Sequence, residues 1–217
     1  MTEIRNILSG LTSGEKIPNL LYRWPISSDE AFVLLKHFYK EEVGKRNRNF
    51  KEADFVYNAI TIVARMLTNY NSARFGALFC GLPGGGKTTL LRAIQQANNY
   101  LRDRGHINRE WGMRITTATE LCSLARAQDN DFSTLQNYTI LGIDDAGREP
   151  IEVKSFGNAL NPIVETLEKR YADQLTTFIT SNYPAPKIQE LYGARVGDRL
   201  REMCEFVPFT NEKSFRQ

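Results

Sequence analysis

The sequence GLPGGGKTT, from Gly81 to Thr89, decides the fold of this chain. It fits the phosphate-binding pattern GxxxxGK[ST], in which glycines let several backbone N–H groups converge on a polyphosphate without side-chain clash. A helix that begins at such a loop adds the positive end of its dipole. Lys87 is expected to reach the β- and γ-phosphates, and the Thr88 hydroxyl to coordinate Mg²⁺. The predicted nucleotide-binding residues of this stretch are Gly81, Pro83, Gly84, Gly85, Gly86, Lys87, Thr88 and Thr89.

The residues on either side of the loop have the pattern that it requires. The run FGALFC, residues 75–80, is short and apolar, as expected of a buried parallel strand. After the loop, apolar residues recur at helical spacing from Leu90 to Leu101, and Gly105 can end the helix. A glycine-rich surface turn that fits the pattern by chance is the alternative, and the flanking strand and helix disfavour it.

The composition indicates one globular domain with a modest extension. The chain has 217 residues, of which 41% are hydrophobic and 24% charged. A net charge of +3 permits contact with nucleic acid without requiring it. The three cysteines are far apart and lack metal-binding spacing, so we expect reduced thiols. The first residues lack the apolar core of a signal peptide and no run approaches the ~20 apolar residues of a membrane span, which predicts a cytoplasmic protein without membrane contact.

Residues 1–50 are expected to form a short helical segment that precedes the ATP-binding domain, residues 51–217. Ser27 to Glu30 offers a capping box for a helix whose apolar face contains Ala31, Leu34, Leu35 and Phe38. This face packs either on the main domain or on a partner protein, and the sequence leaves both open. The basic stretch from Lys36 to Lys51 is interpreted as a charged helix end and a solvated linker.

Strands and helices alternate after the loop, which predicts an α/β fold with a five-stranded parallel sheet flanked by helices. Helices are expected from Asp54, from about Ala118 with Thr117 and Glu120 as a cap, and over 160–171. The four strands expected after the first cover 113–117, 139–143, 176–180 and about 205–209.

Polar residues follow two of these predicted strands. Asp144 and Asp145 end the strand 139–143, and Asn182 follows the strand 176–180. Ligands of open parallel sheets bind outside the carboxyl ends of the strands, so the two aspartates should face the same crevice as the phosphate-binding loop. Asp144 is suited to hold Mg²⁺, and Asp145 to polarise an attacking water. Asn182 either orients a water or contacts a γ-phosphate there, or it only starts the turn before Pro184.

Two arginines share one face of a predicted helix in the stretch LYGARVGDRLREM. Arg195 and Arg199 are one helical turn apart. They either pair with Asp198 and Glu202 of the same helix, or Arg199 is an arginine finger that enters the nucleotide site of a neighbouring subunit. The sequence does not choose between these roles.

Taken in order, these motifs resemble one known family. GLPGGGKTT, IDDAGRE, TSN, YGARVGDRL and SFR at 214–216 are similar to those of the DnaC-type helicase loaders and the related IstB transposition ATPases, within the AAA+ class. The similarity covers roughly residues 50–217. It implies a P-loop NTPase of the AAA+ type that binds ATP and Mg²⁺, with no separate C-terminal lid domain because the chain ends soon after SFR.

The resemblance also implies roles for single residues. Asn182 takes the sensor 1 position, Arg199 the finger position with Arg195 near it, and Arg216 the sensor 2 position. Most AAA+ proteins carry Glu where Asp145 stands, so hydrolysis is expected to be slow or to involve Glu149. The family further implies single-stranded DNA as a ligand, a hexameric replicative helicase as partner, and self-association through Arg199.

These features favour an ATPase that acts as a DNA-replication accessory protein. Three other functions use the same loop: a transposition helper with a transposase as partner, a small-molecule phosphotransferase, and a binding module whose ATP is structural. A phosphotransferase needs an acceptor pocket and an arginine-bearing lid, and the sequence shows neither clearly.

Overall fold

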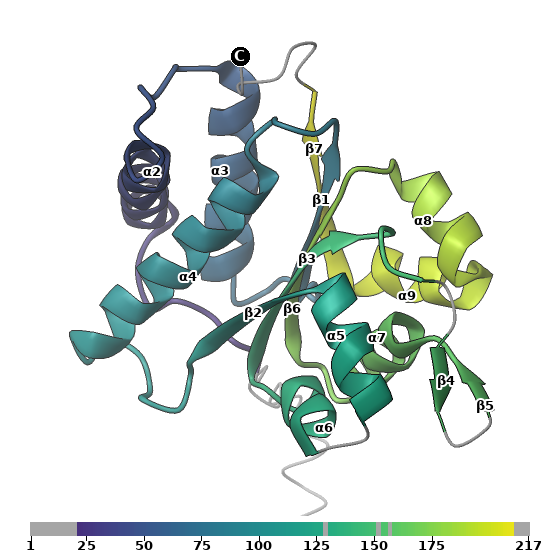
Figure 1. Ribbon diagram of the computed structural model, residues 1–217. Helices are drawn as coiled ribbons and strands as arrows, with labels where there is room; N and C mark the ends of the chain where they lie inside the picture. The colour runs from purple at the N-terminus through teal and green to yellow at the C-terminus, as the bar shows by residue number, and fades with distance from the viewer. Residues whose placement is uncertain (1–20, 128–129, 151–152, 156–157, 211–217) are drawn as a thin grey trace, which may run out of the picture.

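A five-stranded, fully parallel sheet forms the centre of the molecule (Figure 1). The computed structural model describes residues 21–127, 130–150, 153–155 and 158–210. In the order of the sheet the strands are β2 (Met113–Thr117), β3 (Ile140–Ala146), β6 (Thr176–Ser181), β1 (Gly76–Gly81) and β7 (Cys204–Phe209). The predicted α/β fold with five parallel strands is confirmed, and β1, which leads into the phosphate-binding loop, lies between β6 and β7.

Helices cover both faces of the sheet, with a separate apolar core under each layer (Figure 1). Successive residues of a strand point to opposite faces, and β1 shows this directly, because Ala77 and Phe79 belong to one core and Leu78 to the other. One layer contains α2 (Ser28–Gly44), α3 (Asp54–Thr68) and α4 (Lys87–Asp103). The other contains α5 (Ala118–Ala127), α6 (Asn130–Gln136), α7 (Pro162–Ala172), α8 (Ala185–Tyr192) and α9 (Ala194–Met203).

Helix α2 packs on the main domain. Its capping box is present as expected, since the Ser27 hydroxyl accepts from the Glu30 N–H and the Glu30 carboxylate accepts from the Ser27 N–H. Leu35 and Tyr39 are buried against α3 and α4. The sequence left open whether the apolar face of this helix packs on the main domain or on a partner protein. Ala31 and Leu35 of that face are buried in the main domain. The division of the chain at residue 50 remains a prediction, and residues 1–20 lie outside those described.

Several boundaries differ from the expected ones. β3 begins at Ile140 and runs on to Ala146, so the two aspartates extend the strand, with a register shift between Ile143 and Ala146. The helix expected over 160–171 begins at Pro162, because Asn161 caps it by accepting from the Val164 N–H at 3.1 Å. Residues 158–160 belong instead to a small antiparallel pair, β4 (Val153–Ser155) and β5 (Asn158–Leu160), that the sequence reading missed together with α6 and α8. No helix among the described residues is long and apolar enough to cross a membrane.

Candidate nucleotide-binding site

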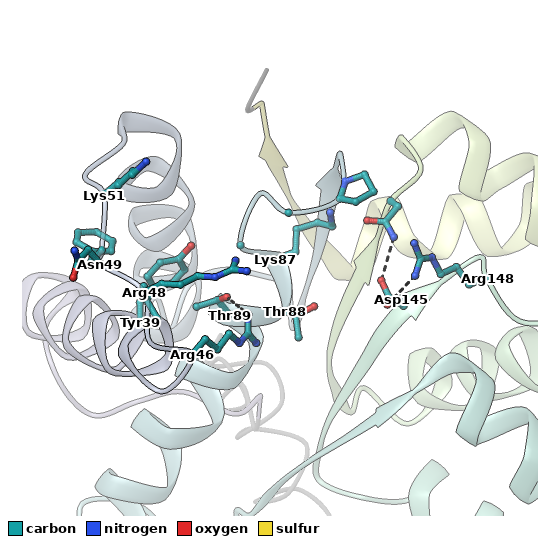
Figure 2. A pocket seen from close by; sticks show the side chains of 16 residues that line it. Tyr39, Arg46, Arg48, Asn49, Lys51, Lys87, Thr88, Thr89, Asp145 and Arg148 are labelled. Atoms are coloured by element: carbon teal, nitrogen blue, oxygen red, sulfur yellow. Dashed lines mark hydrogen bonds and ion pairs between the residues drawn. The ribbon is translucent and has the colours of Figure 1, made fainter. Parts of the chain in front are cut away.

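A pocket opens at the carboxyl ends of the central strands, around the loop between β1 and α4 (Figure 2). Three parts of the chain line it. The first is the phosphate-binding loop with the start of α4, the second is the end of β3 with Asn182 after β6, and the third is the end of α2 with the α2–α3 loop (residues 45–53). The lining residues are Tyr39, Val43, Arg46, Arg48, Asn49, Phe50, Lys51, Pro83, Gly84, Gly86, Lys87, Thr88, Thr89, Asp145, Arg148 and Asn182.

The phosphate-binding loop has the backbone that its glycines predict. Gly84 and Gly86 have φ angles of 84° and 101°, in the left-handed region that side chains disfavour. Gly86 also lies so close to the Tyr39 hydroxyl that a Cβ there would clash with it. The Lys87 ammonium donates to the carbonyls of Gly81 at 2.6 Å and Leu82 at 2.9 Å, which holds it at the base of the loop.

Thr88 and Asp144 lie together as a metal site would require. The Thr88 hydroxyl donates to Asp144 Oδ1 at 2.9 Å, across 56 residues of sequence. The Thr180 hydroxyl on β6 donates to the same oxygen at 2.6 Å, and this carboxylate is buried. Hydroxyl and carboxylate oxygens are the hard ligands that Mg²⁺ prefers, and Mg²⁺ usually takes one or two protein carboxylates together with nucleotide phosphates. The residues present therefore fit Mg²⁺ held by Thr88 and Asp144.

Asp145 points into the pocket from a left-handed backbone. Its φ angle is 58°, at the register shift of β3, and its N–H donates to the Thr180 hydroxyl at 2.9 Å. Asp tolerates this conformation better than most residues, because its short polar side chain can bond locally. Asn182 Nδ2 donates to Asp145 Oδ1 at 3.1 Å, and Arg148 Nη1 lies 3.5 Å from Oδ2 (Figure 2). A carboxylate and an amide from adjacent strands are thus joined at one wall of the pocket.

Glu149 lies outside the pocket lining. It is buried, with Oε2 accepting from the Gly147 N–H at 2.8 Å and Oε1 accepting from the Tyr192 hydroxyl on α8. Burial, and then the charge of Glu149, raise the pKa of Tyr192 well above its usual value, so this phenol stays protonated and donating. Both carboxylate oxygens thus connect the end of β3 to α8. A catalytic role for Glu149 stays a prediction that this placement does not favour.

Arg195 and Arg199 on α9 both pair with an acidic residue of a neighbouring helix, α7. Glu168 Oε1 on α7 lies 3.0 Å from Arg195 Nε and 2.7 Å from Arg199 Nη1, so the acidic partner differs from Asp198 and Glu202, which one of the two sequence alternatives named. The Arg199 guanidinium also lies over the Tyr171 ring, 5.3 Å from its centroid. Neither arginine lines the pocket of its own chain. Arg216 lies outside the described residues.

The α2–α3 loop was interpreted as part of a solvated linker, and its basic residues are exposed as that interpretation requires, but some of them also belong to the pocket. Arg46, Arg48 and Lys51 line the pocket, and Arg46 Nη1 donates to Thr89 Oγ1 at 3.2 Å. Charge density alone did not distinguish such residues from a solvated surface, because the sequence does not say where the end of α2 is packed. Thr180, which bonds to both Asp144 and the Asp145 backbone, was also missed as a site residue.

The sheet order, together with the loop after β1, matches the α/β core fold of AAA+ proteins. Neither the family models nor the curated proteins give a match to this sequence. Solved structures of DNA-replication proteins are similar in fold, at low sequence identity. A DnaC helicase loader is 22% identical over 73% of this chain and 92% of its own, with a TM-score of 0.56. A DnaI structure is 25% identical over 75% and 85%, also with a TM-score of 0.56.

A third structure is the replication initiator DnaA bound to AMPPCP and single-stranded DNA. It is 17% identical over 75% of this chain and 48% of that chain, with a TM-score of 0.51, so this chain spans about half of it. The expected resemblance to helicase loaders is therefore confirmed at the level of structure.

Proposed function

We propose that the protein binds and hydrolyses ATP with Mg²⁺ and acts as an accessory protein of DNA replication, in the manner of a helicase loader. The observation that carries the proposal is the pair of contacts at the strand ends, Thr88 with Asp144 and Asp145 with Asn182, beside a P-loop lysine. Together they would supply a metal site, a carboxylate for water and an amide, and Thr88, Asp145 and Asn182 line the same pocket. The fold similarity to DnaC and DnaI supports the choice of replication over other P-loop functions.

Each residue has a defined part in hydrolysis. Lys87 and the N–H groups of the loop would bind the phosphates, and Thr88 and Asp144 would hold Mg²⁺, which would neutralise part of the phosphate charge. Asp145 accepts a proton from the attacking water, whose oxygen bonds to the γ-phosphorus while the bond to the ADP oxygen breaks. Asn182 fixes the Asp145 carboxylate through its 3.1 Å hydrogen bond.

We further propose that the site is completed by a second copy of the chain. Arg199 does not line its own pocket, and its partner Glu168 is a partly exposed carboxylate that a rival anion could replace. An arginine inserted in trans would stabilise the charge that develops on the transferred phosphoryl group. The partners proposed are a replicative helicase and single-stranded DNA in the cytoplasm, and single-stranded DNA is present in the similar DnaA structure.

Two alanine variants separate nucleotide binding from assembly. Lys87→Ala is expected to abolish ATP binding, with Lys187→Ala on α8 as the matched control, because Lys187 pairs with Glu190 outside the pocket. Arg199→Ala is expected to preserve ATP binding and to lower hydrolysis or assembly, with Arg201→Ala on the same helix as control. Equal loss of binding in the Lys87 and Arg199 variants would contradict the assignment of Arg199 to a neighbouring site.

An affinity pull-down in the presence of ATP tests the partner. Recovery of a replicative helicase with the wild-type chain, and not with Lys87→Ala, is the expected result. Recovery of a transposase instead would indicate a role in target selection for transposition, while the assignment of the ATP site would stand.

A turnover assay tests the phosphotransferase alternative. ATP consumption stimulated by nucleosides in the absence of DNA would indicate a phosphotransferase.

A further inference from the structure

The α2–α3 loop brings basic side chains to the phosphate-binding loop from outside the predicted motifs. Arg46, Arg48 and Lys51 come from this side of the pocket, whereas Asp145 and Arg148 come from the opposite side (Figure 2). Among the described residues that line the pocket, the basic ones also include Lys87, and Asp145 is the acidic one. The positive charge of this lining favours binding of a polyphosphate, and it is larger than the charge of the P-loop lysine alone.

Arg46 reaches the first turn of α4. Its Nη1 donates to Thr89 Oγ1 at 3.2 Å, and Thr89 is the third residue of the helix and is buried. The N–H groups of a first helical turn have no partner within the helix and point toward a bound anion. A guanidinium held at Thr89 therefore lies beside the N–H groups that cradle the phosphates.

The two walls of the pocket fix the direction in which a nucleotide lies. Hydrolysis requires the γ-phosphate at the wall that carries Asp145 and Asn182. The opposite wall, which carries Arg46 together with the apolar side chains of Val43 and Phe50, is then left for the α-phosphate and the nucleoside. We propose that Arg46 binds the α-phosphate of the nucleotide, as a binding residue supplied by the segment before the AAA+ core. This inference rests on the proposed ATP-binding function.

The loop is held in place by packing and hydrogen bonds. The Lys45 ammonium next to Arg46 bonds to Glu42 at 2.7 Å and to Gln96 of α4 at 2.9 Å. On the other side of the loop, the Phe50 ring packs edge-on against Tyr39, with centroids 5.9 Å apart. Arg46 is therefore positioned before a nucleotide arrives, which lowers the entropy cost of binding.

The α-phosphate is common to ATP, ADP and AMP, and this gives the proposal a specific signature. Loss of Arg46 should lower the affinity for all three nucleotides by a similar factor, whereas loss of a γ-phosphate contact should lower the affinity for ATP alone. A charge-assisted hydrogen bond at a partly exposed site corresponds to about tenfold in affinity. Adenosine, which lacks phosphate, should be unaffected.

The test is competition of ATP, ADP, AMP and adenosine against a fluorescent ADP analogue, with Mg²⁺ present, on wild-type protein and Arg46→Gln. Arg46→Lys keeps the charge and should restore part of the affinity. Arg104→Gln is the matched control. Arg104 lies at the C-terminal end of α4, at the opposite end from Thr89, and its guanidinium lies over Tyr100. Thermal unfolding without nucleotide should give the same midpoint for Arg46→Gln and wild type, since Arg46 is exposed.

Three results would overturn the proposal: unchanged nucleotide affinity in Arg46→Gln, a loss confined to ATP, or an equal loss in Arg104→Gln. A failure of the proposed function looks different. In that case the wild-type protein does not bind the ADP analogue, or binds it as well after Lys87→Ala.

Discussion

Thr180 joins the two aspartates of the site, and its substitution gives a sharp test of the geometry. Its side chain is fully buried on β6. The hydroxyl donates to Asp144 Oδ1 at 2.6 Å and accepts from the Asp145 N–H at 2.9 Å. One hydroxyl thus holds both the proposed metal-binding carboxylate and the left-handed backbone of the proposed base.

Thr180→Val keeps the shape of the side chain and removes both hydrogen bonds. The part-buried Asp145 N–H loses its partner, at a cost of about 1–3 kcal/mol, while Asp144 keeps the bond from Thr88 and loses about 1 kcal/mol more. We expect the free energy of unfolding to fall by about 2–4 kcal/mol, and the melting temperature by about 10 °C. A misplaced base and metal ligand should lower kcat by about 100-fold, and nucleotide affinity should change much less because Lys87 is untouched.

The assay compares ATP turnover, ADP affinity and thermal unfolding for wild type, Thr180→Val and Thr180→Ser. The serine variant retains the hydroxyl and should keep kcat within about threefold of wild type, since its loss of one methyl group is a packing effect. A valine variant that turns over ATP at the wild-type rate would refute the argument that the Thr180 hydroxyl positions the aspartates.

Three other predictions concern residues that do not line the pocket. Glu168→Gln removes the carboxylate that pairs with Arg199 and should increase ATP-dependent assembly in analytical ultracentrifugation, with stability changed by less than about 1 kcal/mol; unchanged assembly would count against the proposed role of Arg199. Arg170 is fully buried and donates to the carbonyls of Gln136, Tyr138 and Thr176 at 3.0, 2.7 and 2.6 Å. Arg170→Met should lower the free energy of unfolding in urea by about 3–5 kcal/mol, and a loss below about 1 kcal/mol would contradict this expectation. Burial raises the pKa of Cys80 and Cys122 from 9.0 to about 11, so above pH 9 the thiols ionise in the unfolded chain before they do in the folded one. The free energy of unfolding should therefore fall between pH 9 and 11, and a Cys80→Ser, Cys122→Ser double variant should show a shallower slope.

Arg170 also shows why burial of a charge need not remove it. Burial lowers the pKa of its guanidinium to about 9, which still leaves it charged at neutral pH. Its Nε donates to the Thr177 hydroxyl at 2.8 Å, so the charged group is surrounded by acceptors from α6, β6 and the turn after α6. This contact set connects α7 to the sheet on the face opposite to α2.

Much of the nucleotide site could be predicted because its parts are local in sequence and lie at strand ends. The glycines and Lys87 form one continuous motif, and Asp144 and Asn182 follow short runs rich in β-branched residues, which favour strands. The bounds of β2 were predicted correctly, since its neighbours Gly112 and Ala118 mark a turn and a helix start.

The rest depends on contacts between distant segments, which periodicity does not reveal. Arg46 meets Thr89 across 43 residues, and Thr180 meets Asp144 across 36. Hydrophobic periodicity predicts which face of α2 is apolar, but it does not predict the element on which that face packs. That packing decides whether the basic residues after α2 lie at the pocket or elsewhere on the surface. The same holds for Glu168, because its pairing with Arg199 follows from how α7 and α9 are packed.

A crystal structure with Mg²⁺ and AMPPCP would show directly whether the phosphate-binding loop and the two strand ends bind a nucleoside triphosphate. We predict that the triphosphate lies over residues 84–89, with Mg²⁺ between Thr88 and Asp144, the γ-phosphate toward Asp145 and Asn182, and the α-phosphate toward Arg46. Nucleotide density elsewhere on the protein, or a triphosphate bound with Mg²⁺ away from Thr88 and Asp144, would contradict the account.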